Sequence, residues 1–174
     1  MSKPEWTADP SAVLAVGEGF QLAQVDTRST PGFDGDKHAG LKVQSNSAAE
    51  LAQLQERLYA QSRSGGTERV LLVLQAMDTA GKGGVIRHVV GAIDPQGTKV
   101  YGFKKPTPTE LAHDFLWRVH PHAPAAGEIA IWNRSHYEDV LVARVRNLCN
   151  EQRWRSRYEH IVAFERLLAS EGTT

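Results

Sequence analysis

The apolar positions are densest in the run VLLVLQ at residues 70–75. In an extended chain Leu71 and Val73 point to one side and Leu72 and Leu74 to the other, so both faces need burial. A short apolar run of this kind is typical of a strand inside a parallel sheet. We therefore expect a central strand at Val70–Gln75.

Two further strands and five helices are expected from the remaining pattern. The second strand is expected at Thr98–Phe103 and the third at Glu128–Trp132. Helical spacing of apolar residues precedes the first strand, follows each strand and recurs at roughly Gln152–Ser170. Strands that alternate with helices predict an α/β fold with a parallel sheet.

Polar residues at helix-capping positions suggest where the helices begin. The expected caps are Ser47 with Glu50 for a helix over Ser47–Ser62, Thr107 or Thr109 for a helix carrying Leu111, Phe115, Leu116 and Val119, and Ser135 with Glu138 for one carrying Tyr137, Val140, Leu141, Val145 and Leu148. The last helix is expected to bury Trp154, Tyr158, Ile161 and Leu168.

The N-terminal region lacks such clusters of apolar residues. It is rich in turn-forming residues, as in PGFDGD at 31–36. We expect residues 1–45 to form an extended or partly disordered arm and residues 46–174 to form the folded domain.

Composition and charge exclude several classes of protein. Lys and Arg total 20 and so do Asp and Glu, so no basic surplus indicates binding to nucleic acid or membrane. The single cysteine, Cys149, excludes an intrachain disulfide and is expected to pack in a helix. His120 and His122 flank a proline and are expected in a surface loop rather than a metal site. With no membrane-length apolar run and no signal-peptide core, we expect a soluble, cytoplasmic protein.

A glycine-rich turn, Gly81–Gly84, joins the first strand to its helix. Such a turn directs backbone N–H groups at one point, and Lys82 adds a positive charge, so a phosphate fits there. The turn is close to a Walker A loop, but Ala76 replaces the first Gly and Gly83 replaces the Ser or Thr. Asp78 inside the loop suits a metal ion or a proton acceptor. The alternative is an ordinary glycine-rich connection in a βα unit.

Polar residues after the other two strands complete the candidate site. Asn133 offers a neutral oxygen to Mg²⁺, and Arg134 has the planar donor head that suits transferring phosphates. Glu138 either supplies the missing negative charge or only caps the helix. Lys104 and Lys105 follow the second strand, where they either bind an anion at the ligand-binding edge of the sheet or form a solvated pair.

Three runs together resemble the polyphosphate kinase 2 family, in its class III subgroup. They are LQAMDTAGKGGVIRHVVGAIDPQG, FKKPTPTELAHDFLWRVH and NRSHYEDVLVARV, and the likeness covers about Phe33–Thr174. Members transfer phosphate between inorganic polyphosphate and nucleotides with Mg²⁺. The resemblance implies catalytic roles for Asp78, Lys82 and Arg134, metal contacts for Asp78, Asn133 and Glu138, phosphate or nucleotide contacts for Met77, Thr79, Ala80, Gly81, Gly83 and Gly84, and polyphosphate contacts for Lys104, Lys105, Arg87 and His88.

The resemblance also implies fold, cofactor and partners. We expect a P-loop kinase-like three-layer α/β/α fold with strand order 2-3-1-4-5, Mg²⁺ or Mn²⁺ as cofactor, and inorganic polyphosphate with AMP, ADP or ATP as partners. GDP and GTP are further candidates, and family members tend to form dimers or tetramers.

Family members continue past the position of Thr174 with a further core strand, a basic lid and more helices. We therefore expect only the first three core strands here, no lid, and phosphate binding with weak or no activity. The alternatives are a non-catalytic phosphate-binding remnant, a subunit partner of a full-length kinase, and an ATP-dependent nucleotide kinase on the same fold.

Overall fold

A computed structural model describes residues 6–174 of the chain. It divides into two compact units between Glu50 and Leu51. Helix α2, Lys37–Ser62, contributes to both units. None of the helices in the described part of the chain is both long and apolar enough to span a membrane.

The first unit contains more helix than an extended arm would. Besides the first part of α2 it holds α1, Pro10–Val13, and the 3-10 turn η1, Leu22–Gln24, and Trp6 packs edge-on against Phe33 with ring centroids 5.5 Å apart. The predicted helix start at Ser47 is wrong, because α2 begins ten residues earlier. The Asp36 carboxylate accepts a hydrogen bond from the N–H of Ala39 at 2.8 Å, so Asp36 does the capping expected of Ser47.

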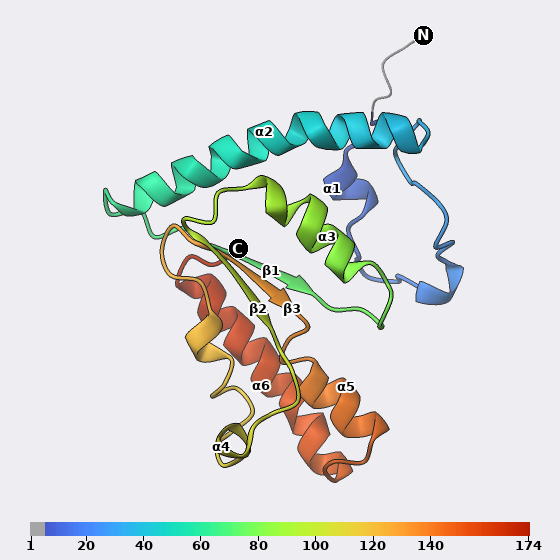
Figure 1. The fold of residues 1–174 in the computed structure, drawn as a ribbon. Coiled ribbons are helices and arrows are strands. Elements are labelled where there is room, and N and C mark those ends of the chain that lie inside the picture. Colours follow the sequence, from blue (N-terminus) through green and yellow to red (C-terminus); the bar gives the residue numbers. More distant parts are fainter. Residues whose placement is uncertain (1–5) are drawn as a thin grey trace. The chain divides into compact units, whose positions relative to one another are not determined.

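The second unit has the alternating order of strands and helices that the sequence predicts (Figure 1). Its elements are β1 Val70–Leu74, α3 Lys82–His88, η2 Val90–Ala92, β2 Thr98–Gly102, α4 Pro108–Leu111, η3 His120–His122, β3 Ile129–Asn133, α5 Glu138–Val145 and α6 Glu151–Ser170. All three predicted strands are confirmed, to within one residue at each end.

The three strands form a parallel sheet in the order β1-β3-β2, as the expected strand order requires. The register aligns Leu74, Asn133 and Gly102, the last residues of the strands. The loops that leave the strands therefore start from one edge of the sheet. Thr174 lies along the other side of β1, where its carbonyl accepts the N–H of Leu71 at 2.9 Å.

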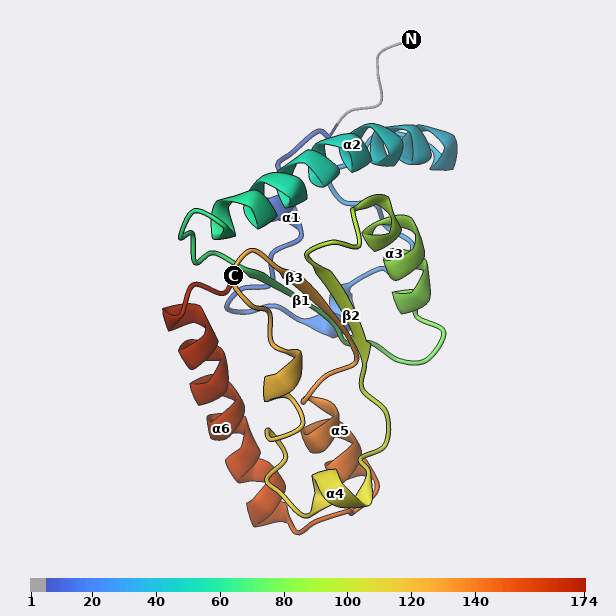
Figure 2. The same ribbon diagram turned by 60° about the vertical axis from the view of Figure 1, so that its left-hand side comes forward.

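The sheet has helices on both faces, which confirms a layered α/β architecture (Figure 2). On one face Leu72 and Ile131 meet Leu54 and Leu58 of α2 around an apolar hollow. On the other face Trp132 packs with Phe103 and with Phe164 of α6. This alternation along each strand is the one expected for a strand apolar on both sides.

Trp132 is at the centre of the core. Its side chain is fully buried, its ring meets that of Phe103 edge-on at 5.3 Å, and its Nε1 donates to the carbonyl of His122 at 2.8 Å. His122 in turn stacks on Tyr101 with centroids 3.3 Å apart. His122 is therefore packed against the core, whereas His120 and Pro121 are exposed at the surface as expected.

The helix predicted after Thr107 is shorter than expected. Thr107 does form a capping box with Glu110, but α4 ends at Leu111. The Asp114 carboxylate accepts the N–H groups of Leu116 and Trp117, which replaces the helical hydrogen bonds with a turn. The single helix expected to reach Val119 is therefore wrong.

The boundaries predicted for the next helix are also wrong. Ser135 does not cap it, because α5 starts at Glu138 after an N-cap residue, Tyr137, whose side chain makes no capping bond. The helix ends at Val145, so Cys149 lies in the turn before α6 rather than in a helix.

The last predicted helix is confirmed in extent, since α6 covers Glu151–Ser170. Its buried face differs from the expectation. Ile161 and Phe164 are buried, whereas Tyr158 is 49% exposed.

Candidate functional site

Three loops begin at the same end of the sheet, formed by the carboxyl ends of β1, β2 and β3. In open α/β folds this end carries the ligand. The loop after β1 is the glycine-rich turn, the loop after β2 carries Lys104 and Lys105, and the segment after β3 carries Arg134. The fold thus brings the main candidate groups to one end of the sheet.

The loop after β1 holds Lys82 at the first position of α3. Gly81 has φ +96°, a left-handed conformation that favours glycine, and this turns the chain into the helix. The Nζ of Lys82 donates to the carbonyls of Ala76 and Met77, both at 2.7 Å. The ammonium group therefore lies over the loop that the sequence assigns to phosphate.

The segment after β3 brings Arg134 across to the same loop. The N–H of Arg134 donates to the carbonyl of Leu74 at 3.0 Å, which joins the ends of β3 and β1. Arg134 has φ +65°, which is unusual for a non-glycine residue. Its Nη2 lies 2.5 Å from Oδ1 of Asp78, and the two side chains are 40% and 81% exposed.

These groups line one cavity of about 240 Å³. Its lining residues are Asp78, Thr79, Gly81, Lys82, Gly83, Asn133 and Arg134. A Cβ added at Gly81 or Gly83 would meet no protein atom within 4 Å, so the glycines leave open space at the loop. The cavity combines two cations, one carboxylate and the amide groups of a helix start, which is a suitable setting for a phosphorylated ligand.

Other predicted residues lie near this cavity without lining it. Met77, Ala80 and Gly84 belong to the same loop, Lys104 and Lys105 are exposed after β2, Arg87 and His88 form the last turn of α3, and Glu138 begins α5. Larger cavities lie elsewhere in the described residues. Two of them, at the turn between α5 and α6 and between α6 and residues 114–120, are marked by no sequence motif.

Oxygen donors suited to a hard cation are present in the cavity. The Asp78 carboxylate and the Asn133 amide both line it. In the described residues no group of three or more His, Cys, Asp or Glu side chains could hold a metal. Mg²⁺ commonly takes one or two protein oxygens and completes its shell with water and substrate phosphates, so this sparse donor set fits it.

Glu138 belongs to a partly buried network with Gln75 and Ser135. Its carboxylate accepts a hydrogen bond from Nε2 of Gln75 at 2.6 Å, and the hydroxyl of Ser135 donates to Oε1 of Gln75 at 3.3 Å. The same hydroxyl accepts the N–H of Tyr137 at 3.2 Å. The expected capping box of Ser135 with Glu138 is therefore wrong, and both side chains instead connect α5 to the end of β1.

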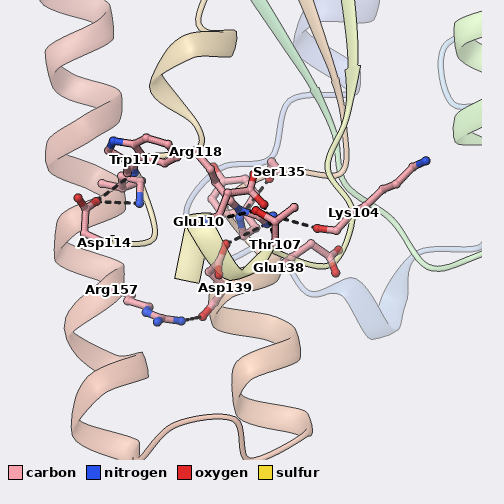
Figure 3. Close-up of polar contacts among 12 residues, drawn as sticks. Lys104, Thr107, Glu110, Asp114, Trp117, Arg118, Ser135, Glu138, Asp139 and Arg157 are labelled. Atoms are coloured by element: carbon pink, nitrogen blue, oxygen red, sulfur yellow. Dashed lines mark hydrogen bonds and ion pairs between the residues drawn. The ribbon is translucent and has the colours of Figure 1, made fainter. Parts of the chain in front are cut away.

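A second network, missed in the sequence, centres on Arg118 (Figure 3). Its Nη1 donates to the carbonyl of Lys104 at 2.9 Å, and its Nη2 lies 3.4 Å from Oδ2 of Asp139. Arg157 of α6 donates to the carbonyl of Asp139. Burial raises the pKa of the Asp139 carboxyl, although the positive charges of Arg118 and Arg157 oppose that shift. The sequence feature that could have predicted this network is Arg118 itself, a charged residue inside the largely apolar run FLWRVH.

A buried histidine, His136, lies two residues after Arg134. His136 is 1% exposed, and burial lowers the pKa of its imidazole, although the charge of Glu165 opposes the shift. The Tyr137 hydroxyl donates to Glu165, and burial together with that bond raises the pKa of Tyr137 to about 12. Both side chains therefore stay neutral near pH 7 and act as structural support for the segment after β3.

The comparisons with known proteins agree with this geometry. The model of the polyphosphate kinase 2 family matches residues 35–174. An AMP/ADP-polyphosphate phosphotransferase of Meiothermus ruber is 51% identical over 155 residues, which cover 89% of this chain and 57% of the relative. An ADP-polyphosphate phosphotransferase of Rhodopseudomonas palustris is 39% identical over 169 residues, covering 90% of this chain and 57% of that protein.

Solved structures give the same result. The crystal structure of polyphosphate kinase 2 from Arthrobacter aurescens TC1 superposes with a TM-score of 0.94 at 49% identity, and covers 98% of this chain and 60% of that one. The chain thus spans 57–60% of the length of these relatives. The fold is that of a P-loop kinase, and the chain belongs to the polyphosphate kinase 2 family.

Proposed function

We propose that residues 46–174 carry the P-loop part of a kinase that moves phosphate between inorganic polyphosphate and AMP or ADP. The observation that supports this most directly is the convergence of Asp78, Lys82 and Arg134 on one cavity at the ligand-binding edge of the sheet. The names of the Meiothermus and Rhodopseudomonas relatives support the substrate class.

Lys82 and Arg134 would hold the phosphate being transferred. Phosphoryl transfer requires alignment of donor and acceptor and neutralisation of charge, with little covalent chemistry by the protein. Phosphate oxygens are stronger acceptors than the two carbonyls that Lys82 contacts, so the ammonium group would exchange partners when phosphate enters. Arg134 would turn its fork from Asp78 toward the phosphate in the same way.

Asp78 and Asn133 would hold Mg²⁺ or Mn²⁺, and Glu138 would contribute through the first turn of α5. The cation, when bound, neutralises negative charge on the phosphates. Asp78 would also orient the acceptor phosphate once it no longer pairs with Arg134. Met77, Thr79, Ala80, Gly81, Gly83 and Gly84 would surround the phosphate or nucleotide with backbone groups.

The polyphosphate would lie along exposed, mostly basic side chains near the cavity. Lys104 and Lys105 after β2, with Arg87 and His88 on α3, are the proposed contacts. GDP and GTP are further candidate nucleotides, and assembly into a homo-oligomer and a cytoplasmic location complete the proposal.

The test is release of ADP or ATP from polyphosphate and AMP or ADP by the 174-residue chain, alongside a direct measurement of polyphosphate affinity. Asp78→Asn should abolish turnover, whereas the matched exposed variant Asp26→Asn, in a turn of the first unit, should leave it unchanged. Turnover that survives Asp78→Asn would contradict the assignment. Affinity without turnover would favour a binding remnant, and turnover with ATP but not polyphosphate would indicate an ATP-dependent kinase.

A further inference from the structure

The loop after β2 is held at both ends but has exposed lysines in its middle. At its start the N–H of Phe103 donates to the carbonyl of Asn133 at 3.0 Å. At its end the N–H of Thr107 donates to the carboxylate of Glu110 at 2.6 Å. Lys104 and Lys105 lie between these points, and each has a long side chain with several rotatable bonds. Their position therefore depends on how the backbone between the two ends is held.

Arg118 supplies a third anchor, in the middle of that loop. Its guanidinium donates to the carbonyl of Lys104 at 2.9 Å and lies 5.4 Å from the ring centroid of Phe103. Figure 3 shows the Lys104 side chain directed away from this cluster while its carbonyl faces Arg118. The arginine thus holds the backbone of Lys104 and leaves its ammonium group exposed.

Burying the Arg118 guanidinium costs more free energy than a purely structural role would require. The Arg118 side chain is 5% exposed, its Nε has no acceptor in the described part of the chain, and its charge partner Asp139 is 15% exposed. Buried ion pairs commonly contribute less stability than apolar side chains of similar volume. Arg118 does connect the β2 loop, through the carbonyl of Lys104, to the first turn of α5, through the carboxylate of Asp139.

We propose that Arg118 is a positioning residue that fixes Lys104 and Lys105 for polyphosphate by holding the carbonyl of Lys104 against Asp139 of α5. The inference rests on the proposed function, because it assumes that the two lysines bind polyphosphate. Arg118 itself does not touch the substrate.

The test is a double-mutant cycle in the full chain, with affinities for polyphosphate and for ADP measured by calorimetry. Arg118→Gln is expected to weaken polyphosphate binding roughly tenfold, the effect of losing one charge-assisted hydrogen bond, and to leave ADP affinity within about twofold. Lys104→Ala with Lys105→Ala should weaken it by a similar factor. Combined with Arg118→Gln, the lysine variants should add little, because both changes remove the same contact.

Arg118→Lys should restore part of the affinity, since an ammonium group can still donate to the Lys104 carbonyl. The matched control is Arg155→Gln, which removes an exposed arginine of α6 that pairs with Glu151 and should change neither affinity. Additive losses, or equal losses for polyphosphate and ADP, would overturn the proposal.

If the wild-type chain does not bind polyphosphate, that result refutes the proposed function but does not test the role of Arg118. Hydrogen exchange measured without ligand then tests that role. Arg118→Gln should then speed exchange at the hydrogen-bonded amides of Phe103 and Thr107 while the core amides of β3 stay protected. Unchanged exchange at these two amides, or loss of protection throughout the second unit, would refute the positioning role.

Discussion

The two walls of the cavity are built differently. The loop after β1 is exposed from Ala76 to Gly81, and Met77 is 84% exposed. The segment after β3 has Asn133 and Arg134 at the cavity, but the residues on either side, Trp132 and Ser135, are fully buried.

The two walls therefore have different roles: the loop after β1 can adjust to a ligand, and the segment after β3 holds its position. A glycine-rich exposed loop can adjust its amides and the Lys82 ammonium group to a ligand at little cost in packing. The wall after β3 keeps Arg134 at a fixed place, because buried neighbours on both sides resist displacement. The pairing of one adjustable wall with one fixed wall suits a site that must hold a chain of phosphates and still align one of them.

The largest expected effect is on the stability of the fixed wall. Trp132→Ala should lower the free energy of unfolding by about 3–5 kcal/mol, because it opens a cavity in the core and leaves the His122 carbonyl without its donor. Leu72→Ala on β1, where the side chain is already 36% exposed, is the matched control and should cost about 1 kcal/mol. Urea unfolding of both variants measures the contrast, and equal losses would show that the strand before the exposed loop is packed as tightly as β3.

The next effect concerns the group that the fixed wall presents. Arg134→Ala should lower the rate of phosphate transfer about 10²- to 10³-fold, because it removes the guanidinium that would turn from Asp78 to the developing charge. Its exposed ion pair with Asp78 should contribute only about 0–1 kcal/mol to stability. Parallel rate and urea measurements check both statements. A large loss of stability would mean that Arg134 supports the wall rather than acting on the ligand.

The smallest effect is a dependence of stability on pH. Burial lowers the pKa of His136 in the folded state below its ordinary 6.5, so the unfolded chain binds a proton that the folded chain excludes. Stability should therefore be fully present above pH 6.5 and fall as pH drops below it, by at most about 1.4 kcal/mol per pH unit for this group. Burial lowers the pKa of His122 in the same direction, so part of the dependence should remain without His136.

His136→Gln should flatten that dependence between pH 7 and pH 5.5, as urea unfolding at several pH values would show. His38→Gln, at an exposed position of the first unit, is the matched control. An unchanged slope in His136→Gln would mean that the pKa of the ring is the same in the folded and the unfolded chain. A steeper slope would mean that the nearby carboxylate of Glu165, 3.6 Å from Nε2, raises that pKa in the folded protein.

The sequence was sufficient for features that depend on local pattern. Strands β1, β2 and β3 follow from apolar runs that end in turn residues, and the glycine turn predicts the start of α3 at Lys82. Shared strand ends then place Asp78, Lys82 and Arg134 together without further information. The sequence-based roles of these residues remain predictions.

What the sequence could not supply depends on competition between partners distant in the chain. Asp36 and Ser47 are both good caps, and local rules do not decide between them. Ser135 has the spacing of a cap, but its hydroxyl is used by Gln75, 60 residues away. Arg118 and Asp139 become a pair only once the loop after β2 and the start of α5 are brought together.

The left-handed backbone at Arg134, with φ +65°, and at Thr79, with φ +67°, has a practical consequence. Such conformations cost free energy in non-glycine residues, so glycine or asparagine would relieve them at both positions. A laboratory selection for thermal stability alone would thus favour glycine or asparagine at position 134. Such variants would have a higher melting temperature but would lack the Arg134 guanidinium at the cavity. A more stable variant of this domain should therefore keep Thr79 and Arg134 and take its stabilising substitutions at other surface positions.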